Sequence, residues 1–304
     1  MLDNIEFIIP CGGKSTRNYP HSKGLPHKSL LPFGSMRLID YVLKEIFDMG
    51  GRHITIVCSS QKVIDDFKEA LKPCPEIEAK LRASGRTHIA DALKATEIPQ
   101  DADIKYVIQS KPLGTSHVLG LAHRISKNRH AVMYFPDDLY INKDPKNTHL
   151  KKLVNAFLKN EKQILITGMY RDDVSNNAII ENGRLIEKPK NPTNHIGGIS
   201  PMVIPKPVLD YMTEKVEPLE NGTFKPSLIG NEWVYTDGIN GFLDERGEKN
   251  PHELRMFLKD DDDAFMDTGT LPLYEHAMLL ALLTMSVFKD EHIAFAKALL
   301  NKPE

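Results

Sequence analysis

The stretch that decides the fold is FIIPCGGKSTRNYP, residues 7–20. It starts with a short apolar run, Phe7–Ile9, which is typical of a strand and ends at Pro10. Gly12 and Gly13 follow at once, and glycines directly after a strand let the backbone approach a ligand and expose its N–H groups. The nearby residues that can donate to phosphate oxygens are Lys14, Thr16, Arg17, Lys23 and Lys28. The segment therefore predicts a strand followed by an anion-binding turn.

The tetrapeptide GKST at 13–16 looks like the end of a nucleotide-binding P-loop. That loop has the pattern G-x-x-x-x-G-K-[ST], so with Gly13 as its second glycine the first would stand at position 8. Position 8 is Ile8, in the middle of the predicted strand. A P-loop is therefore excluded. Two interpretations of the turn remain, an ordinary surface turn with solvated basic residues and a phosphate-binding turn of another kind.

Apolar strands alternate with helical patterns along the first half of the chain. Strands are predicted at 7–9, 54–58, 105–109 and 131–135. Helices are predicted at 38–47, 63–71 and 116–125. Buried strands in alternation with helices favour an α/β fold whose mostly parallel sheet is covered by helices on both faces.

The second half of the chain is more mixed. A helix is predicted at 153–158, a strand at 164–169, and a hairpin around Asn182-Gly183. Residues 213–226 are rich in Pro, Gly and polar residues and are predicted as a loop. The segments 274–283 and 291–300 are predicted to form a helical C-terminal tail. The sequence shows no boundary between domains.

The composition limits the partners and the location that we expect. Of the 304 residues, 41% are hydrophobic and 26% are charged, with a formal charge of −2. This balance gives no general attraction to nucleic acid or to anionic membranes, so neither is an expected partner. The cysteines, Cys11, Cys58 and Cys74, lack metal-ligand spacing and fit free thiols in a reducing cytoplasm. Residues 1–10 lack the features of a secretory signal, and no apolar run reaches the roughly 18 residues of a membrane span.

The residues after the glycine turn resemble a family signature, the N-terminal motif of the sugar-1-phosphate nucleotidylyltransferases, also called nucleotide-sugar pyrophosphorylases. The residues that carry this resemblance are Thr16-Arg17, Pro20, Lys28 and Leu30-Leu31-Pro32. Two positions depart from the signature. Ser15 stands where the family usually has a glycine, and one extra residue, assigned to His27, lies between Pro26 and Lys28. Both departures lie in the loop that would cover a triphosphate.

Five further segments resemble motifs of the same family, in the same order. They are the nucleobase segment at 109–117, a strand end with a metal-binding aspartate at 134–141, a Glu-Lys-Pro motif at 186–194, a Thr-Asp segment at 232–239 and a closing Asp-x-Gly segment at 265–282. The layout is most similar to the bacterial UTP–glucose-1-phosphate uridylyltransferases. This resemblance implies a Rossmann-like mixed sheet with helices on both faces, of the nucleotide-diphospho-sugar transferase type, followed by a helical tail.

The resemblance also implies one nucleotidyltransferase domain, residues 1–304. Within it, 1–145 would bind the nucleotide, 146–270 would bind the sugar, and 271–304 would form C-terminal helices. The family's reaction transfers the nucleotidyl group of an NTP to a sugar 1-phosphate, such as glucose 1-phosphate, and releases pyrophosphate. The sequence is most similar to the branch of the family that uses UTP. The expected partners are therefore these small-molecule substrates and, for the protein itself, further copies of the chain in a homo-oligomer.

Two aspartates are the candidate ligands of a Mg²⁺ cofactor. Asp137 follows a five-residue apolar run, so it is expected at the carboxyl end of a buried strand, where open α/β sheets bind ligands. Asp267 stands in the closing motif, two residues before Gly269. Aspartate oxygens are the hard ligands that Mg²⁺ prefers, and the resemblance gives both residues to the metal. From the residues alone, Asp138 remains an alternative ligand to Asp137. It also remains open that Asp137 and Asp267 are only carboxylates of a loop or turn, without a metal.

The resemblance assigns roles to the other site residues. Arg17 would hold the departing β- and γ-phosphates and Lys28 the α-phosphate, whereas Lys188 would bind the sugar phosphate and Glu187 a sugar hydroxyl. The catalytic residues would be Arg17, Lys28, Lys188, Asp137 and Asp267. The residues expected around the nucleotide are Gly12, Gly13, Thr16, Gln109, Pro112 and Gly114. The residues expected around the sugar, besides Glu187 and Lys188, are Asp138, Ala178 and Gly198.

Some choices stay open in the sequence. Asn177-Ala178 replaces the family's Tyr-Gly, and an alanine there narrows the pocket, so a sugar other than glucose is an alternative. So is the use of dTTP, CTP or ATP in place of UTP. A catalytically weak regulatory paralogue that binds nucleotide sugars is the alternative of another class. We expect His117 to line the nucleotide-facing helix, His21, His27 and His195 to be incidental, and the acidic run 260–263 to be a solvated loop.

Overall fold

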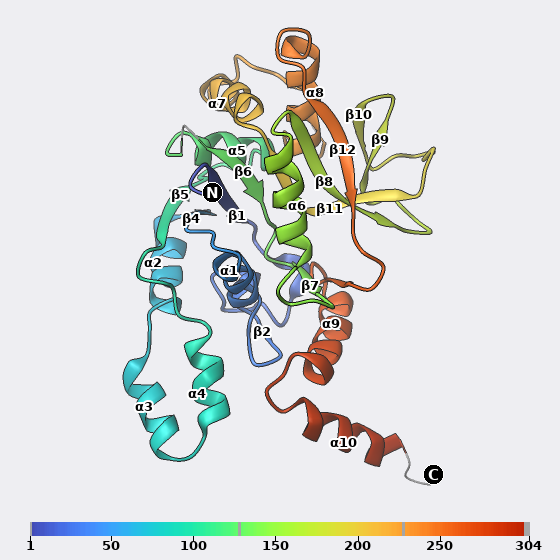
Figure 1. Cartoon of the computed structure of the whole chain (residues 1–304). Coiled ribbons are helices and arrows are strands. Elements are labelled where there is room, and N and C mark those ends of the chain that lie inside the picture. Colours follow the sequence, from blue (N-terminus) through green and yellow to red (C-terminus); the bar gives the residue numbers. More distant parts are fainter. Residues whose placement is uncertain (1, 127–128, 227–228, 301–304) are drawn as a thin grey trace.

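The computed structural model of the chain describes residues 2–126, 129–226 and 229–300 (Figure 1). In these residues a nine-stranded sheet has the order β10-β9-β11-β6-β1-β4-β5, and β8 and β12 continue from β11. The strands of this sheet are β1 (Ile5–Cys11), β4 (His53–Cys58), β5 (Asp103–Ile108), β6 (His130–Met133), β8 (Gln163–Tyr170), β9 (Ala178–Glu181), β10 (Arg184–Glu187), β11 (Ile196–Ile204) and β12 (Glu253–Leu258). Two small sheets pair β2 (Pro32–Phe33) with β3 (Met36–Arg37) and β7 (Asp138–Ile141) with β13 (Ala264–Asp267).

The main sheet is mixed, as the sequence predicts. Strand β1 runs parallel to β4 and β6, and β4 runs parallel to β5. Strand β11 is antiparallel to β6, β8 and β9, so the second half of the chain supplies the antiparallel part. The predicted hairpin is β9–β10, which turns at Asn182-Gly183, where both residues have positive φ. These pairings confirm the predicted fold class.

Helices cover both faces of this sheet. One face packs against α1 (Leu38–Asp48), α2 (Gln61–Ala70) and α6 (His149–Lys159), and α9 (Leu271–Thr284) joins the same hydrophobic cluster. The other face packs against α5 (Thr115–His123), α7 (Lys206–Glu220) and α8 (Tyr235–Arg246). In Figure 1, α3 (Pro75–Ala83) and α4 (Thr87–Lys94) extend away from the sheet, and α10 (Lys289–Leu300) leads outward to the C-terminus. The predicted helical tail is present as α9 and α10.

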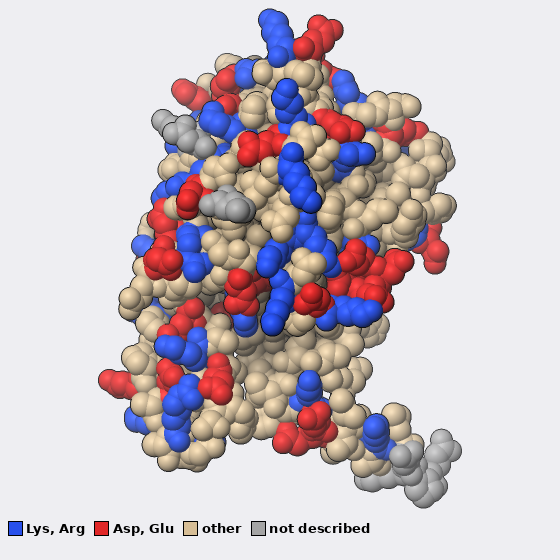
Figure 2. All heavy atoms as spheres, viewed as in Figure 1, with Lys and Arg blue, Asp and Glu red and all other residues tan. Residues whose placement is uncertain are grey.

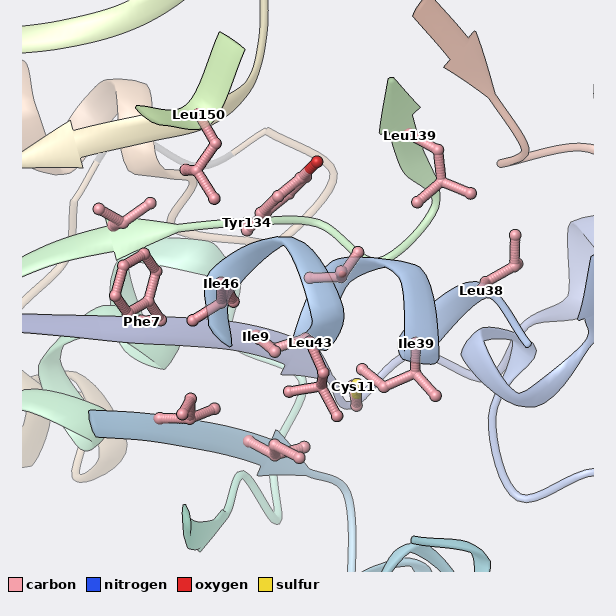
Figure 3. Close-up of a cluster of buried hydrophobic side chains, with 14 of the residues drawn as sticks. Phe7, Ile9, Cys11, Leu38, Ile39, Leu43, Ile46, Tyr134, Leu139 and Leu150 are labelled. Carbon is pink, nitrogen blue, oxygen red and sulfur yellow. The ribbon is translucent and has the colours of Figure 1, made fainter. Parts of the chain in front are cut away.

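Strand β1 lies at the centre of both hydrophobic clusters. Successive side chains of a strand point to opposite faces, and Phe7 and Ile9 enter the cluster under α1 while Ile8 enters the cluster under α5. Figure 3 shows Phe7 and Ile9 among side chains of α1, including Leu43 and Ile46. A strand that is buried on both faces must be apolar throughout, which explains the run that precedes the glycine turn.

One sequence-based prediction is wrong in part. Residues 213–226 were predicted as a loop, and 221–226 do lie outside any helix or strand, yet α7 continues to Glu220 despite Pro218, because Val208, Met212 and Val216 bury one helical face. The acidic run 260–263 is a loop with its first three residues exposed, as predicted, but Asp263 is 3% exposed and accepts a hydrogen bond from the Lys143 backbone N–H at 2.8 Å. The helices α3, α4 and α8 were not predicted from the sequence. The helix α3 has no buried residue, so its sequence carries no apolar stripe to detect.

The surface carries both signs of charge. On the face seen in Figure 2, Lys and Arg side chains are interspersed with Asp and Glu side chains, in keeping with the formal charge of −2. In the part of the chain that the structure describes, no single helix is long and apolar enough to cross a membrane. Helices α9 and α10 meet that test of length and composition only when taken together, and they are bent by 112° at the break between them.

Replacing Phe7 tests whether β1 supports both layers. We expect Phe7→Ala to lower the free energy of unfolding by about 3–5 kcal/mol, because it opens a cavity beneath α1. Chemical denaturation would measure this loss. The control is Ile77→Ala on α3, where the side chain is 50% exposed and the expected change is about 0.5 kcal/mol. A loss below about 1 kcal/mol for Phe7→Ala would contradict this account of the core.

Candidate active site

A cavity of about 510 Å³ opens where three parallel strands of the main sheet end. Gly12 directly follows β1, Gln109 directly follows β5, and Asp137 lies in the turn between β6 and β7. Because parallel strands end at the same edge, residues far apart in the sequence meet here. All of the predicted site residues line this cavity except Thr16 and Lys188.

The glycine turn is tied to the segment that carries Lys28. Ser15 adopts φ 55° and ψ 23°, the left-handed region that favours glycine, which explains why a glycine would be usual at this position. Its hydroxyl accepts a hydrogen bond from the Lys28 backbone N–H at 2.8 Å, and its carbonyl accepts one from the Ser22 hydroxyl at 2.8 Å. A serine adopts this backbone conformation less readily than a glycine would, but its hydroxyl adds a hydrogen bond to the Lys28 segment. Arg17 follows in the short 3-10 helix η1 (Thr16–Asn18) and is exposed on the cavity side.

The two predicted metal ligands meet beside Gly269. A Cβ atom on Gly269 would lie 2.9 Å from Asp267 Oδ1 and 3.1 Å from Asp137 Oδ2, so both carboxylates approach the same point. The Gly269 backbone N–H donates to Asp267 Oδ1 at 2.7 Å, and Lys28 Nζ donates to Asp137 Oδ2. The Thr268 backbone N–H donates to the Asp137 carbonyl at 2.8 Å. These contacts hold one cation and two carboxylates together at the floor of the cavity.

Asp138 is oriented differently from its neighbour. It is paired with Asp267 across the β7–β13 ladder, and its carboxylate accepts a hydrogen bond from the Ser200 backbone N–H at 3.1 Å. Burial, and then the nearby charges of Asp137 and Asp267, raise the pKa of Asp138 to about 8. The contact with Ser200 supports Asp137, rather than Asp138, as the partner of Asp267 in a metal site.

The amide of Gln109 has a defined orientation. Its Nε2 donates to the Gly114 carbonyl at 3.0 Å, and this oxygen can only accept, so the amide nitrogen must lie on that side. The same nitrogen lies 3.1 Å from His117 Nδ1, while His117 Nε2 lies 3.0 Å from Glu220 Oε1. Gln109 Oε1 therefore faces Gly12, 3.1 Å from the position that a Cβ on Gly12 would take. This geometry presents a hydrogen-bond acceptor to the cavity.

Gly114 could not be another residue without moving the chain. It has φ 100°, and a Cβ there would come within 2.5 Å of the Trp233 carbonyl oxygen. The Trp233 backbone N–H donates to the Leu113 carbonyl at 2.9 Å, and its carbonyl accepts from the Ser116 N–H at 3.0 Å. The segment that leads into α8 thus packs directly on the segment that carries Gln109, and it closes one side of the cavity.

The sugar-facing residues come from β9, β10 and β11. Ala178 pairs with Gly198 and with Glu187, so these three lie side by side. Glu187 Oε2 is enclosed and has no hydrogen-bond partner in the described residues. Burial raises the pKa of Glu187, which Lys188 partly opposes. An enclosed carboxylate oxygen without a partner is costly, so this atom is suited to a ligand hydroxyl.

Lys188 lies outside this group. Its backbone has φ 49°, its N–H donates to the Asn177 carbonyl at 3.0 Å, and its side chain is exposed. Thr16 is likewise exposed and away from the cavity lining. Both aspartates, Lys28 and Glu187 therefore line one cavity, whereas Lys188, whose charge acts on the pKa of Glu187, is not part of the lining.

Among the cavity residues that the sequence analysis missed or misjudged are a histidine and an arginine. His27, expected to be incidental, is 3% exposed and lines the cavity. Its Nδ1 accepts from the Ser29 backbone N–H at 3.2 Å, and burial lowers its pKa to about 4, so the ring is neutral with its proton on Nε2. Arg171, which directly follows β8, also lines the cavity and was not predicted. His27 departs from the family signature as an extra residue and Arg171 stands in no motif, so the sequence carried no signal that either lines the cavity.

Comparison with known proteins agrees with this geometry. The family model described as "Nucleotidyl transferase" matches residues 7–281. The chain belongs to the nucleotidyl transferase family. It is 25% identical over 313 residues to a UTP–glucose-1-phosphate uridylyltransferase of Bacillus subtilis (strain 168), covering 98% of this chain and 97% of the relative. It is 24% identical over 307 residues to the enzyme of the same name from Staphylococcus haemolyticus (strain JCSC1435), covering 96% and 97%.

Solved structures of this family show the same fold. The UDP-glucose pyrophosphorylase of Acinetobacter baumannii superposes with a TM-score of 0.76 at 18% identity, covering 97% of this chain and 99% of that one. A UTP-bound structure from the same organism gives a TM-score of 0.75 at 18% identity, covering 98% and 99%. The match confirms the nucleotidyltransferase-type fold with its C-terminal helices. The family model over residues 7–281, in turn, confirms the family resemblance found in the motifs.

The role of Ser15 is open to a direct test with two variants of this nucleotidyl transferase. Ser15→Ala removes the hydroxyl but keeps a side chain in the left-handed region, so we expect it to lose about 1 kcal/mol of unfolding free energy. Ser15→Gly also loses the hydroxyl but relieves the backbone, so it should be about 1 kcal/mol more stable than the alanine variant. Chemical denaturation gives both values. Equal stability of the alanine variant and the wild type would show that the contact with Lys28 contributes nothing.

Proposed function

We propose that the chain transfers the uridylyl group of UTP to glucose 1-phosphate, giving UDP-glucose and pyrophosphate. The observation that carries this proposal is the meeting of Lys28, Asp137 and Asp267 at one point of the cavity. The cation and the N–H groups of the glycine turn are suited to bind a nucleotide's phosphates, and the two carboxylates are suited to hold a metal ion beside them. The names of the relatives from Bacillus subtilis and Staphylococcus haemolyticus support the choice of UTP and glucose.

The donor set at this point fits Mg²⁺. Mg²⁺ is usually held by one or two carboxylates together with substrate phosphates, rather than by a cage made only of protein groups. Two carboxylates approach the same point here, and no group of three or more potential ligands occurs in the described residues. Asp137 and Asp267 would hold the ion, which when bound supplies neutralisation of phosphate charge. Lys28, which contacts Asp137, lies where it would meet the α-phosphate of a bound nucleotide.

The chain's own residues supply positioning and charge. Arg17 would hold the β- and γ-phosphates, and Lys28, fixed through Ser15, would hold the α-phosphate. An oxygen of the sugar phosphate attacks the α-phosphorus in line, the bond from that phosphorus to the bridging oxygen breaks, and pyrophosphate leaves. No general base is needed, because the attacking phosphate is already an anion at neutral pH. Catalysis therefore depends mainly on orientation and on fixed charge.

The orientation of Gln109 bears on the choice of NTP. Its Oε1 faces the cavity as an acceptor, and its Nε2 is already used by the Gly114 carbonyl. Uracil and thymine carry an N3–H that can donate to this oxygen, whereas N3 of cytosine is itself an acceptor. A site built around one hydrogen bond rejects a base that cannot make it. The geometry thus supports UTP or dTTP over CTP.

The state and location of the protein are further proposals. Exposed apolar side chains of α9 and α10, among them Leu279 and Phe295 at 58% and 66%, support a homo-oligomer, which sedimentation would test. Cys11, Cys58 and Cys74 are free thiols, which supports a cytoplasmic location.

A substrate panel tests the proposed function. Pyrophosphate release would be measured for UTP, dTTP, CTP and ATP, each with glucose 1-phosphate and with other hexose 1-phosphates. We expect UTP with glucose 1-phosphate to give the highest kcat/KM, with dTTP next and CTP at least about a hundredfold lower because of the Gln109 orientation. Nucleotide binding without pyrophosphate release from any pair would instead support a regulatory paralogue.

Removal of one carboxylate tests the phosphate centre. We expect Asp137→Asn to lower kcat with UTP and glucose 1-phosphate by at least about a hundredfold, because preorganised charge is usually the largest contribution to such a rate. The control is Asp260→Asn, which changes an exposed aspartate that pairs with Lys152 outside the cavity and should leave turnover unchanged. Near-normal turnover of Asp137→Asn would contradict the proposed mechanism.

A further inference from the structure

Arg171 is a cavity-lining cation without a partner for its charge. It directly follows β8 and lines the same cavity as Asp137 and Asp267. Its Nε is enclosed and has no hydrogen-bond partner, and its guanidinium forms no ion pair with any carboxylate among residues 2–126, 129–226 and 229–300. The side chain is half-buried, and an enclosed N–H without an acceptor costs free energy in the empty protein. Such a group is suited to an anionic ligand.

The guanidinium packs on the strand that carries Asp267. Its central carbon lies 5.6 Å from the centroid of the Phe265 ring. Phe265 and Asp267 are two residues apart in strand β13, so their side chains project from the same face of the strand. Arg171, Phe265 and Asp267 all line the same cavity, so an anion bound there is within the cavity that the guanidinium faces.

Lys188, which the family motif assigns to the sugar phosphate, does not reach this place. Its side chain is exposed and is absent from the cavity lining. Its backbone φ is 49°, directly after Glu187, the last residue of β10. The charge of Lys188 acts on the pKa of Glu187 from outside the cavity lining, whereas Arg171, directly after β8, is itself part of that lining.

The surroundings of Arg171 indicate the sugar phosphate rather than the triphosphate. Its backbone N–H donates to the His195 carbonyl at 2.9 Å, directly before β11, the strand that carries Gly198. Gly198 pairs with Ala178, and Ala178 pairs with Glu187. The glycine turn with Arg17 and Lys28 belongs to the first half of the chain. Arg171 therefore belongs to the sugar-facing group.

We propose that the Arg171 guanidinium binds the phosphate of the sugar 1-phosphate and orients its attacking oxygen, in the place that the family gives to Lys188. This assignment rests on the proposed function for the identity of the substrate. The planar guanidinium can donate two parallel hydrogen bonds to one phosphate, which a lysine cannot do. Packing against Phe265 holds the plane of the fork, so little freedom is lost when the phosphate binds.

Steady-state kinetics of Arg171→Met tests this assignment. Methionine keeps the packing on Phe265 but removes the charge and all donors. We expect the KM for glucose 1-phosphate to rise about ten- to hundredfold, while the KM for UTP changes less than about twofold. In the reverse direction the KM for UDP-glucose should rise and that for pyrophosphate should not. Equal rises in the KM values of both substrates, or no rise, would overturn the assignment.

Two further variants complete the design. Lys188→Met should raise the KM for glucose 1-phosphate less than Arg171→Met does, and a larger rise would overturn the assignment. Arg255→Met, at an exposed arginine on β12 that pairs with Glu253, is the matched control and should change neither KM. If the wild type turns over no pair of substrates, the proposed function fails. Calorimetric titration with glucose 1-phosphate then decides the assignment, because binding equal in wild type and Arg171→Met overturns it, whereas binding lost only in the variant supports it.

Discussion

The antiparallel pairing of β7 with β13 is the constraint on which the site depends. It sets Asp267 directly opposite Asp138 and brings the turn with Asp137 against Gly269. Each strand has only four residues, so the pair is held by its surroundings rather than by its own ladder. Thr268 donates to the Asp137 carbonyl through its backbone N–H, and its own carbonyl accepts from Asn18 Nδ2 at 2.9 Å. The closing segment of the chain is thereby fixed to the first loop as well as to the sheet edge.

Charge balance explains why these groups can lie together in a protein without ligand. Two aspartates on one site repel each other, and Lys28 offsets this repulsion by its contact with Asp137. Lys28 in turn is positioned through its backbone by Ser15. Arg171, packed on Phe265, remains without such a partner in the described residues. The site is thus arranged for anions that enter between fixed cations and carboxylates, which is what transfer of a nucleotidyl group between phosphates requires.

Much of the fold follows from patterns within short segments. The buried strand Phe7–Ile9, the α1 pattern and the turn at Asn182-Gly183 are local signals, and the structure confirms each of them. Asp137 could be placed because the carboxyl ends of parallel strands meet at one edge. The full length of helix α7 could not be predicted. Its last turns are polar and contain a proline, and the apolar face that they continue is recognised only from its packing in the structure.

The missed site residues were hidden for different reasons. Arg171 packs on Phe265, which is remote in sequence, and no spacing rule links the two. His27 looked like an insertion, but its buried ring caps the short 3-10 helix η2 (Lys28–Leu30), which carries Lys28. Lys188 illustrates the opposite error, since the motif matches but the side chain is exposed and does not line the cavity. A motif therefore identifies which residues are present, whereas the backbone decides which of them reach the ligand.

The most direct test of the central claim is the kinetic coupling between the two aspartates. The value of kcat/KM for UTP and glucose 1-phosphate would be measured for Asp137→Asn, Asp267→Asn and the double variant. If both carboxylates act on one phosphate centre, the double variant should be no worse than about tenfold below the worse single variant. Losses that multiply fully in the double variant would show that the aspartates act independently and would contradict the account of a single site built by β7 and β13.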